Sequence, residues 1–241
     1  MISHSQVTDL QPEALAFLNK IPLFKGLDQA ALVDIACRMQ YRTFGAGLTL
    51  FHQDMPGMML YMLAEGHVRL YSIGQSGQEF TYHIYGPMEI FGELSILDDG
   101  YHSTTCIVMT PIKTWLLSKD KLLDVLHSYP EINFRLLRIL ASRTRSTTRK
   151  VEAMAFLDVQ GRLAYEILNL AGKYGRQTGE GIEITIPLHQ NDLASMVGAT
   201  RESVNKALSL LRTQNMIKLS GSSIVMTDQA GLEQMLQERG R

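Results

Sequence analysis

NDLASMVGATRESVNKALSLL, residues 191–211, is the stretch that decides how the C-terminal part of the chain folds. Apolar residues recur every three or four positions before and after Gly198, which predicts two short helices that each bury one face. Ala194 is small enough for the helices to approach closely, Gly198 tolerates a positive φ angle in the turn, and Thr200 is a suitable cap for the second helix. These features together predict a helix-turn-helix.

The segments on either side of this stretch favour strands. An alternating run at residues 182–186 precedes it, and residues 216–227 read as a hairpin with halves at 217–219 and 224–226 around a turn at 220–223. A strand, a helix-turn-helix and a hairpin together describe a winged helix, whereas the alternative is an ordinary helix pair with a solvated face. In a winged helix, five residues at the start of the second helix are expected to face DNA: Thr200, Arg201, Glu202, Asn205 and Lys206.

The composition is that of a globular chain with a real core. The 241 residues are 45% apolar and 20% charged, which allows one large domain or two small ones. No apolar run approaches the roughly 18 residues of a membrane span, and residues 1–13 lack the pattern of a secretory signal. Cys37 and Cys106 are isolated, which fits a reducing cytoplasm and predicts no metal site. We therefore expect a cytoplasmic protein.

Charge is distributed unevenly along the chain, although the net charge is only −1. Residues 1–130 hold 8 basic and 13 acidic side chains, whereas residues 131–241 hold 15 and 11. A basic C-terminal half suits a partner that carries phosphates.

The N-terminal half reads as a β-structure between helical segments. Residues 12–36 and 118–127 have helical character, and short apolar or alternating runs separated by glycines fill the interval from 39 to 117. Gly66 and the Gly74/Gly77 pair are placed as hairpin turns. This pattern predicts an antiparallel barrel or roll, with strands around 40–44, 48–52, 59–64, 67–73, 79–85, 104–109 and 112–118.

A long helix is predicted to start after Pro130 and to run without Gly or Pro to about Phe156. Six of its residues follow alternating spacings of three and four, which is the pattern of a dimer seam: Leu137, Leu140, Thr144, Thr147, Val151 and Met154. A helix packed on its own barrel is the alternative. Because arginines at 135, 138, 143, 145 and 149 lie off the seam, we favour a parallel homodimer.

These elements give an α+β chain with three parts. Residues 1–129 form a sensor β-roll with flanking helices, residues 130–157 a dimerisation helix and hinge, and residues 158–241 a winged-helix DNA-binding domain. Asp158 is expected to cap a helix at 159–173, after a bend at 156–158, and residues 174–181 are expected to be a polar loop.

Three segments resemble the CRP/FNR superfamily of transcription regulators: FGEL at 91–94, FLDVQGRLA at 156–164 and VGATRESVNKAL at 197–208. The resemblance covers nearly the whole chain and implies a homodimer that binds palindromic double-stranded DNA and works with RNA polymerase. It places Arg201, Glu202 and Lys206 at the base-reading positions. Family members with Arg-Glu-x-x-x-Arg read a TGTGA-like half-site, and Lys206 replaces the last arginine here, so the half-site is expected to differ at one position.

The resemblance also implies an effector site made of six residues: Gly92, Glu93, Ser103, Thr104, Thr147 and Thr148. In cyclic-AMP-binding relatives an Arg-Ser pair at the position of Ser103 and Thr104 holds the cyclic phosphate. No arginine occurs between Arg69 and Arg135 of this chain, and hydroxyls do not replace the bidentate grip of an arginine. Neighbouring His102 is expected to be an exposed loop residue. Cyclic AMP, another small effector and activity without an effector all stay open.

Other classes of protein fit the sequence less well. An enzyme is not expected, because the chain has no nucleophile–base set, metal-ligand spacing or phosphate loop. Redox and haem sensing lack an N-terminal cysteine cluster and a convincing axial ligand. The alternative class is a nucleotide-binding regulatory subunit that controls a partner protein instead of DNA. A steep loss of affinity with salt would favour DNA.

Overall fold

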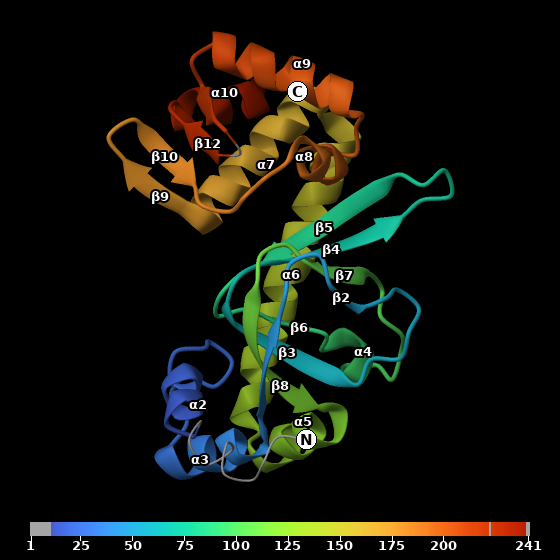
Figure 1. Ribbon diagram of the computed structural model, residues 1–241, viewed down its shortest axis with the longest axis vertical. Coiled ribbons are helices and arrows are strands. Elements are labelled where there is room, and N and C mark those ends of the chain that lie inside the picture. Colours follow the sequence, from blue (N-terminus) through green and yellow to red (C-terminus); the bar gives the residue numbers. More distant parts are fainter. Residues whose placement is uncertain (1–10, 222, 240–241) are drawn as a thin grey trace. The chain divides into compact units, whose positions relative to one another are not determined.

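The computed structural model describes residues 11–221 and 223–239 (Figure 1). The expectation for the start of the chain therefore lies largely outside the described residues, as does Ser222 of the predicted turn at 220–223. The described residues divide into two compact units. The first takes in residues 11–71 and 83–143, and the second takes in residues 72–82, 144–221 and 223–239.

The first unit is built on a β-roll. Two four-stranded sheets, with orders β1-β8-β3-β6 and β2-β7-β4-β5, provide its strands. The strands are β1 (Gln40–Phe44), β2 (Thr49–Phe51), β3 (Met59–Glu65), β4 (Val68–Ile73), β5 (Glu79–Tyr85), β6 (Ile90–Phe91), β7 (Thr105–Val108) and β8 (Ile112–Ser118). The predicted strands are confirmed, and the short strand β6 is an addition.

Helices cover one side of the roll and share its core. They are α2 (Gln11–Leu18), α3 (Gln29–Arg38) and α5 (Lys119–Ser128), with the single turn α4 (Leu94–Leu97) after β6. Phe17 of α2 and Tyr41 of β1 both lie against the Trp115 ring, with centroids 6.4 and 4.9 Å away. The predicted turn at Gly66 has a φ of 78°, and a Cβ there would lie 2.2 Å from the Pro111 oxygen.

Helix α6 runs from Glu131 to Phe156, as predicted. It belongs to both units, because the division falls between Arg143 and Thr144. Its buried or half-buried side includes Ile132, Leu136 and Ala153, and its opposite side is exposed. Within the described residues, α6 therefore has one face that is exposed along much of its length.

The second unit is a winged helix. Asp158 caps α7 (Val159–Tyr174), as expected, since its Oδ1 accepts a bond from the Gly161 amide at 2.8 Å. Helices α8 (Gln190–Val197) and α9 (Arg201–Thr213) pack against α7, and α10 (Gln229–Arg239) follows the wing. The sheet order is β11-β12-β10-β9, formed by β9 (Gly175–Thr178), β10 (Gly181–Ile184), β11 (Ile217–Ser220) and β12 (Ser223–Met226).

One expectation for this unit is wrong. Residues 174–181 were expected to form a loop, but β9 occupies half of the segment and pairs with β10. The Thr178 hydroxyl donates to the Gly181 oxygen at 2.8 Å and closes a tight hairpin between the strands. Cross-strand pairing therefore outweighs the low strand propensity of a glycine-rich polar segment. None of the helices described is long and apolar enough to span a membrane.

Candidate DNA-binding surface and effector site

The turn between α8 and α9 has the conformation that its sequence predicts. Gly198 adopts φ 61°, ψ 44°, and a Cβ on it would lie 2.7 Å from the Met154 methyl group. The Ala199 amide donates to the Ala194 oxygen at 3.1 Å, which completes the end of α8. Thr200 Oγ1 then accepts from the Ser203 amide at 3.2 Å and caps α9. The orientation of α9 is thus defined by local bonds at its first turn.

Helix α9 presents a polar face opposite its buried one. Val204, Ala207, Leu208 and Leu211 are buried, whereas Arg201, Glu202 and Lys206 are exposed. Lys206 and Glu202 form an ion pair at 2.8 Å. An exposed pair at this spacing is worth only roughly 0.3–0.5 kcal/mol, so both side chains are available to a partner. The polar face of α9 therefore presents charged hydrogen-bond donors and an acceptor that are exposed to solvent.

Gln190 is a residue of this surface that the sequence did not reveal. Its Oε1 lies 3.5 Å from Arg201 Nη2 and 3.3 Å from Asn205 Nδ2. Gln190 begins α8, and in helix-turn-helix proteins the first helix crosses the DNA backbone. The side chain therefore connects the two helices at the edge of the predicted base-reading face. No periodic or motif signal marks an exposed glutamine eleven positions before its partner.

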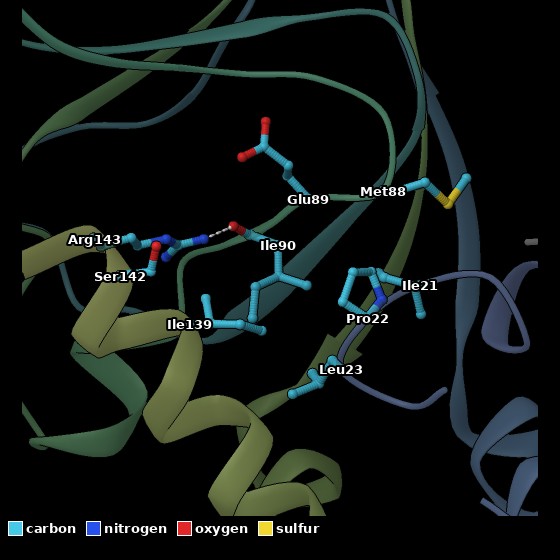
Figure 2. Close-up of a pocket in the computed structure, with 9 residues that line it drawn as sticks. All are labelled: Ile21, Pro22, Leu23, Met88, Glu89, Ile90, Ile139, Ser142 and Arg143. Atoms are coloured by element: carbon cyan, nitrogen blue, oxygen red, sulfur yellow. Dashed lines mark hydrogen bonds between the residues drawn. The ribbon is translucent and has the colours of Figure 1, made fainter. Parts of the chain in front are cut away.

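In the first unit, the buried carboxylate of Glu93 forms an ion pair with the half-buried Arg143 of α6. Glu93 is 1% exposed, and Arg143 Nη1 donates to its Oε1. Figure 2 shows Arg143 donating also to the backbone oxygen of Ile90. Its guanidinium lies over the Tyr85 ring, 4.6 Å from the ring centroid. Burial raises the pKa of the Glu93 carboxyl, and the positive charge of Arg143 opposes that rise.

Arg143 supplies a charge that sequence reasoning missed. It was placed among the arginines off the dimer seam, but within the first unit it reaches the predicted effector residue Glu93. On its other side lies a cavity of about 210 Å³, lined mainly by apolar residues of the Ile21–Leu23 loop, the Met88–Ile90 turn and Ile139 of α6 (Figure 2). Arg143 is half-buried on α6, and the spacing of residues along this helix does not identify a partner fifty positions away.

The other predicted effector residues lie in different environments. Gly92 has a φ of 86° and directly precedes Glu93. Thr104 is buried and Ser103 is exposed. Thr147 and Thr148 belong to the second unit and are exposed, and the Thr148 hydroxyl donates to the Thr144 oxygen of its own helix at 3.0 Å. The structure thus joins Glu93 to Arg143, and the roles of the remaining residues stay predictions.

The expectation that His102 is an exposed loop residue is wrong. The residue is only 7% exposed, and its ring is stacked on Phe51 with centroids 3.7 Å apart. Its Nδ1 lies 3.3 Å from the Ser95 hydroxyl. Burial lowers the pKa of the imidazole. The adjacent polar residues suggested a solvated loop, but the aromatic face of Phe51 is a better site for the ring.

His102 is expected to make stability depend on pH. Because its pKa in the folded chain is lower than the ordinary 6.5, the unfolded chain binds the proton more readily, and stability falls as the pH falls through 6.5. In His102→Phe, which retains the stacking on Phe51, the urea midpoint should change less between about pH 7 and pH 5 than in the wild type. Equal changes in both proteins would refute this role.

Gly92→Ala should destabilise the roll by roughly 1–3 kcal/mol, because it combines backbone strain with a collision. The new Cβ would lie 2.5 Å from the Met59 oxygen, which is backbone and has little freedom to move. Gly47 is the matched control, since it has a φ of 82° and no atom within 4 Å of an added Cβ. Chemical unfolding should show a clearly larger loss for Gly92→Ala than for Gly47→Ala, and equal losses would contradict the collision.

Side chains that could ligate a metal are scattered in the part of the chain that the structure describes. No cluster of three or more His, Cys, Asp or Glu side chains occurs there. Cys37 is exposed and Cys106 is buried, and both are free thiols.

Comparison with known proteins agrees with both units. Residues 41–129 match the family model of the cyclic nucleotide-binding domain, and residues 161–235 match that of the Crp-like helix-turn-helix domain. A CRP-like cAMP-activated global transcriptional regulator of Mycobacterium tuberculosis is 35% identical over 88% of this chain and 94% of the relative. The cyclic AMP receptor protein of Thermus thermophilus is 29% identical over 89% and 96%.

Solved structures share the fold. The c-di-GMP responsive global regulator CLP of Xanthomonas campestris superposes with a TM-score of 0.73 over 83% of this chain and all of that chain, at 20% identity. FixK2 of Bradyrhizobium japonicum gives the same TM-score at 19% identity, over 81% of this chain and 96% of that one.

A sensor-type β-roll joined by a long helix to a winged helix-turn-helix defines a transcription regulator with a DNA-binding domain. The chain belongs to the CRP/FNR superfamily. Regulators of this family bind DNA and act as dimers.

Proposed function

We propose that the protein is a homodimeric regulator that binds a palindromic DNA site through α9 and responds to a small effector in the β-roll. One observation carries the DNA-binding part. Arg201, Glu202 and Lys206 stand exposed on a helix whose other face is buried against α7 and α8. RNA polymerase is the further partner that membership of the family implies.

The chemistry of these side chains suits the major groove. A guanidinium such as that of Arg201 grips O6 and N7 of guanine with two bonds, and the Glu202 carboxylate accepts from N4 of cytosine. Lys206 reaches guanine with a single flexible ammonium group, so it imposes less geometry than an arginine. We therefore expect a half-site in which one position is read less strictly than the others.

The exposed face of α6 supports the dimer. Phe134, Leu137 and Val151 are 72%, 59% and 61% exposed, values that are unusual for large apolar side chains on one helix. Three further exposed residues, Ala141, Thr144 and Thr148, lie on the same face. The six positions follow alternating spacings of three and four. This face contains Leu137, Thr144 and Val151 of the predicted seam, while Leu140 and Met154 lie half-buried beside it. A second copy of α6 is the partner that would cover this face.

Effector control rests on the Glu93–Arg143 pair. Among the described residues, Glu93 Oε2 is a buried atom that lacks a hydrogen-bond partner, and an unsatisfied buried acceptor is costly. A ligand hydroxyl would satisfy it, and the adjacent Arg143 would contact an acceptor on the same ligand. The M. tuberculosis relative is described as cAMP-activated and the X. campestris regulator as c-di-GMP responsive. Nucleotides of both kinds combine hydroxyls with anionic phosphates.

Calorimetry of the full-length protein with cyclic AMP, cyclic GMP and cyclic di-GMP tests this control. One nucleotide should bind, and Glu93→Gln should weaken its binding because the amide presents a donor to the ligand hydroxyl. Lys113→Gln is a control that removes an exposed charge distant in sequence from the pair. Absence of heat for all three nucleotides, together with unchanged DNA affinity in their presence, would reject control by cyclic nucleotides.

A further inference from the structure

The tip of the β4–β5 hairpin groups with the winged helix. Residues Ser72–Tyr82 fall in the second unit, although β4 and β5 are strands of the roll. The tip is closed by its own bonds, since the Gly74 amide donates to the Gln78 oxygen at 2.8 Å and the Ser72 and Tyr82 hydroxyls lie 3.2 Å apart. It is therefore an ordered element within the unit that also contains α8 and α9.

A buried hydroxyl pair connects this tip to the first helix of the helix-turn-helix. Thr81 Oγ1 lies 2.7 Å from Ser195 Oγ, and the two residues are 0% and 6% exposed. The Ser195 hydroxyl donates to the Asp192 oxygen at 2.8 Å, so Thr81 is the donor toward Ser195. Ser195 lies inside the continuous buried run from Leu193 to Val197. The bond thus fixes the buried side of α8 and does not involve the exposed side chains of α9.

A buried ion pair holds the tip from a second direction. Lys150 Nζ of α6 lies 2.8 Å from Glu166 Oε1 of α7, with side chains 12% and 8% exposed. The same ammonium donates to the backbone oxygen of Tyr82 at 3.5 Å and lies 5.4 Å from the centre of the Phe80 ring. Phe80 in turn lies 3.6 Å from the position of a Cβ on Gly198, in the turn between α8 and α9. The tip therefore contacts α6, α8 and the turn within one unit.

We infer that residues 72–82 form a clamp that positions α8, and that Thr81 is a positioning residue for DNA binding that acts through Ser195. This inference rests on the proposed function, because it treats α8 and α9 as the DNA reader. Residues 72–82 include the start of β5, so the clamp is continuous along the chain with a strand of the roll. Its hydroxyl pair is directional, which a purely apolar contact would not be.

A double-mutant cycle on the full-length protein tests the clamp. Thr81→Val and Ser195→Ala should each weaken binding to a selected palindromic duplex between about twofold and tenfold, the effect expected for one lost hydrogen bond. The double variant should bind no more weakly than the weaker single variant, since both changes remove the same bond. Thr81→Ser keeps the hydroxyl and should restore most of the affinity. Additive losses, or no loss in any variant, would overturn the inference.

Hydrogen exchange of the same proteins supplies a readout that needs no DNA. Amides of α8 should exchange several-fold faster in Thr81→Val and in Ser195→Ala than in the wild type. Thr114→Val is the matched control, because Thr114 is also 0% exposed and donates to a backbone oxygen, that of Met62, inside the first unit. Unchanged α8 exchange in Thr81→Val would refute the clamp. Failure of the wild type to bind DNA would instead refute the proposed function.

Discussion

Arg201→Ala is expected to weaken binding to the palindromic site by roughly 1–3 kcal/mol and to relax the choice of base at one position of each half-site. Arg201 is the first residue of α9, is exposed, and has a long contact of 3.5 Å to Gln190. Its loss should therefore act on DNA recognition with little effect on folding. Fluorescence anisotropy with duplexes substituted at each position measures both the affinity and the specificity.

Arg212→Ala is the matched control for this prediction. Arg212 is also exposed and on α9, but it lies in the last turn, away from the end that enters the groove. It should change affinity much less and leave the base preference intact. If Arg201→Ala binds all duplexes as the wild type does, the assignment of α9 as the reader is wrong.

Leu137→Glu is expected to convert the dimer into monomers and, for that reason, to have the largest effect on DNA binding. Leu137 is 59% exposed on α6 and would be buried by a second copy of the helix. Burial of a leucine contributes about 1.5–3 kcal/mol per side chain, and the substitution removes it from both protomers while placing two carboxylates together. A monomer contacts one half-site, so affinity for the palindrome should fall by more than the roughly 1–3 kcal/mol expected for Arg201→Ala.

Analytical ultracentrifugation over a range of protein concentrations measures this change. Leu123→Glu is the matched control. Leu123 is an exposed leucine on α5, so its substitution introduces the same charge on a different helix. The control should stay dimeric. A dimeric Leu137→Glu variant would show that another surface joins the two chains.

Elements whose residues interact locally were predictable from the sequence. Asp158 and Thr200 cap helices through bonds that span three residues, and Gly198 adopts the left-handed conformation that its turn requires. The bounds of α6 follow from a Pro before it and the absence of Gly and Pro within it. In each case the deciding contacts lie within a few positions along the chain.

Features that depend on distant partners were not predictable. Arg143 reads as a surface residue of a helix until the fold brings Glu93 to it across fifty positions. His102 reads as a loop residue until Phe51 supplies an aromatic face. The clamp needs Thr81 and Ser195, which are separated by 114 positions and have common side chains. A single sequence carries periodicity and local turn chemistry, but no direct record of such pairs.

Affinity for a selected palindromic duplex, measured as a function of salt concentration, decides whether this chain reads DNA as a symmetric dimer. Each phosphate contact contributes a slope of about 0.9 to the fall of log affinity with log salt. Two copies of the winged helix, each with Arg201 and Lys206 exposed on α9, should therefore give a slope of several units, with two chains bound per duplex. Affinity that is unchanged by salt would contradict the account and favour a subunit that controls another protein.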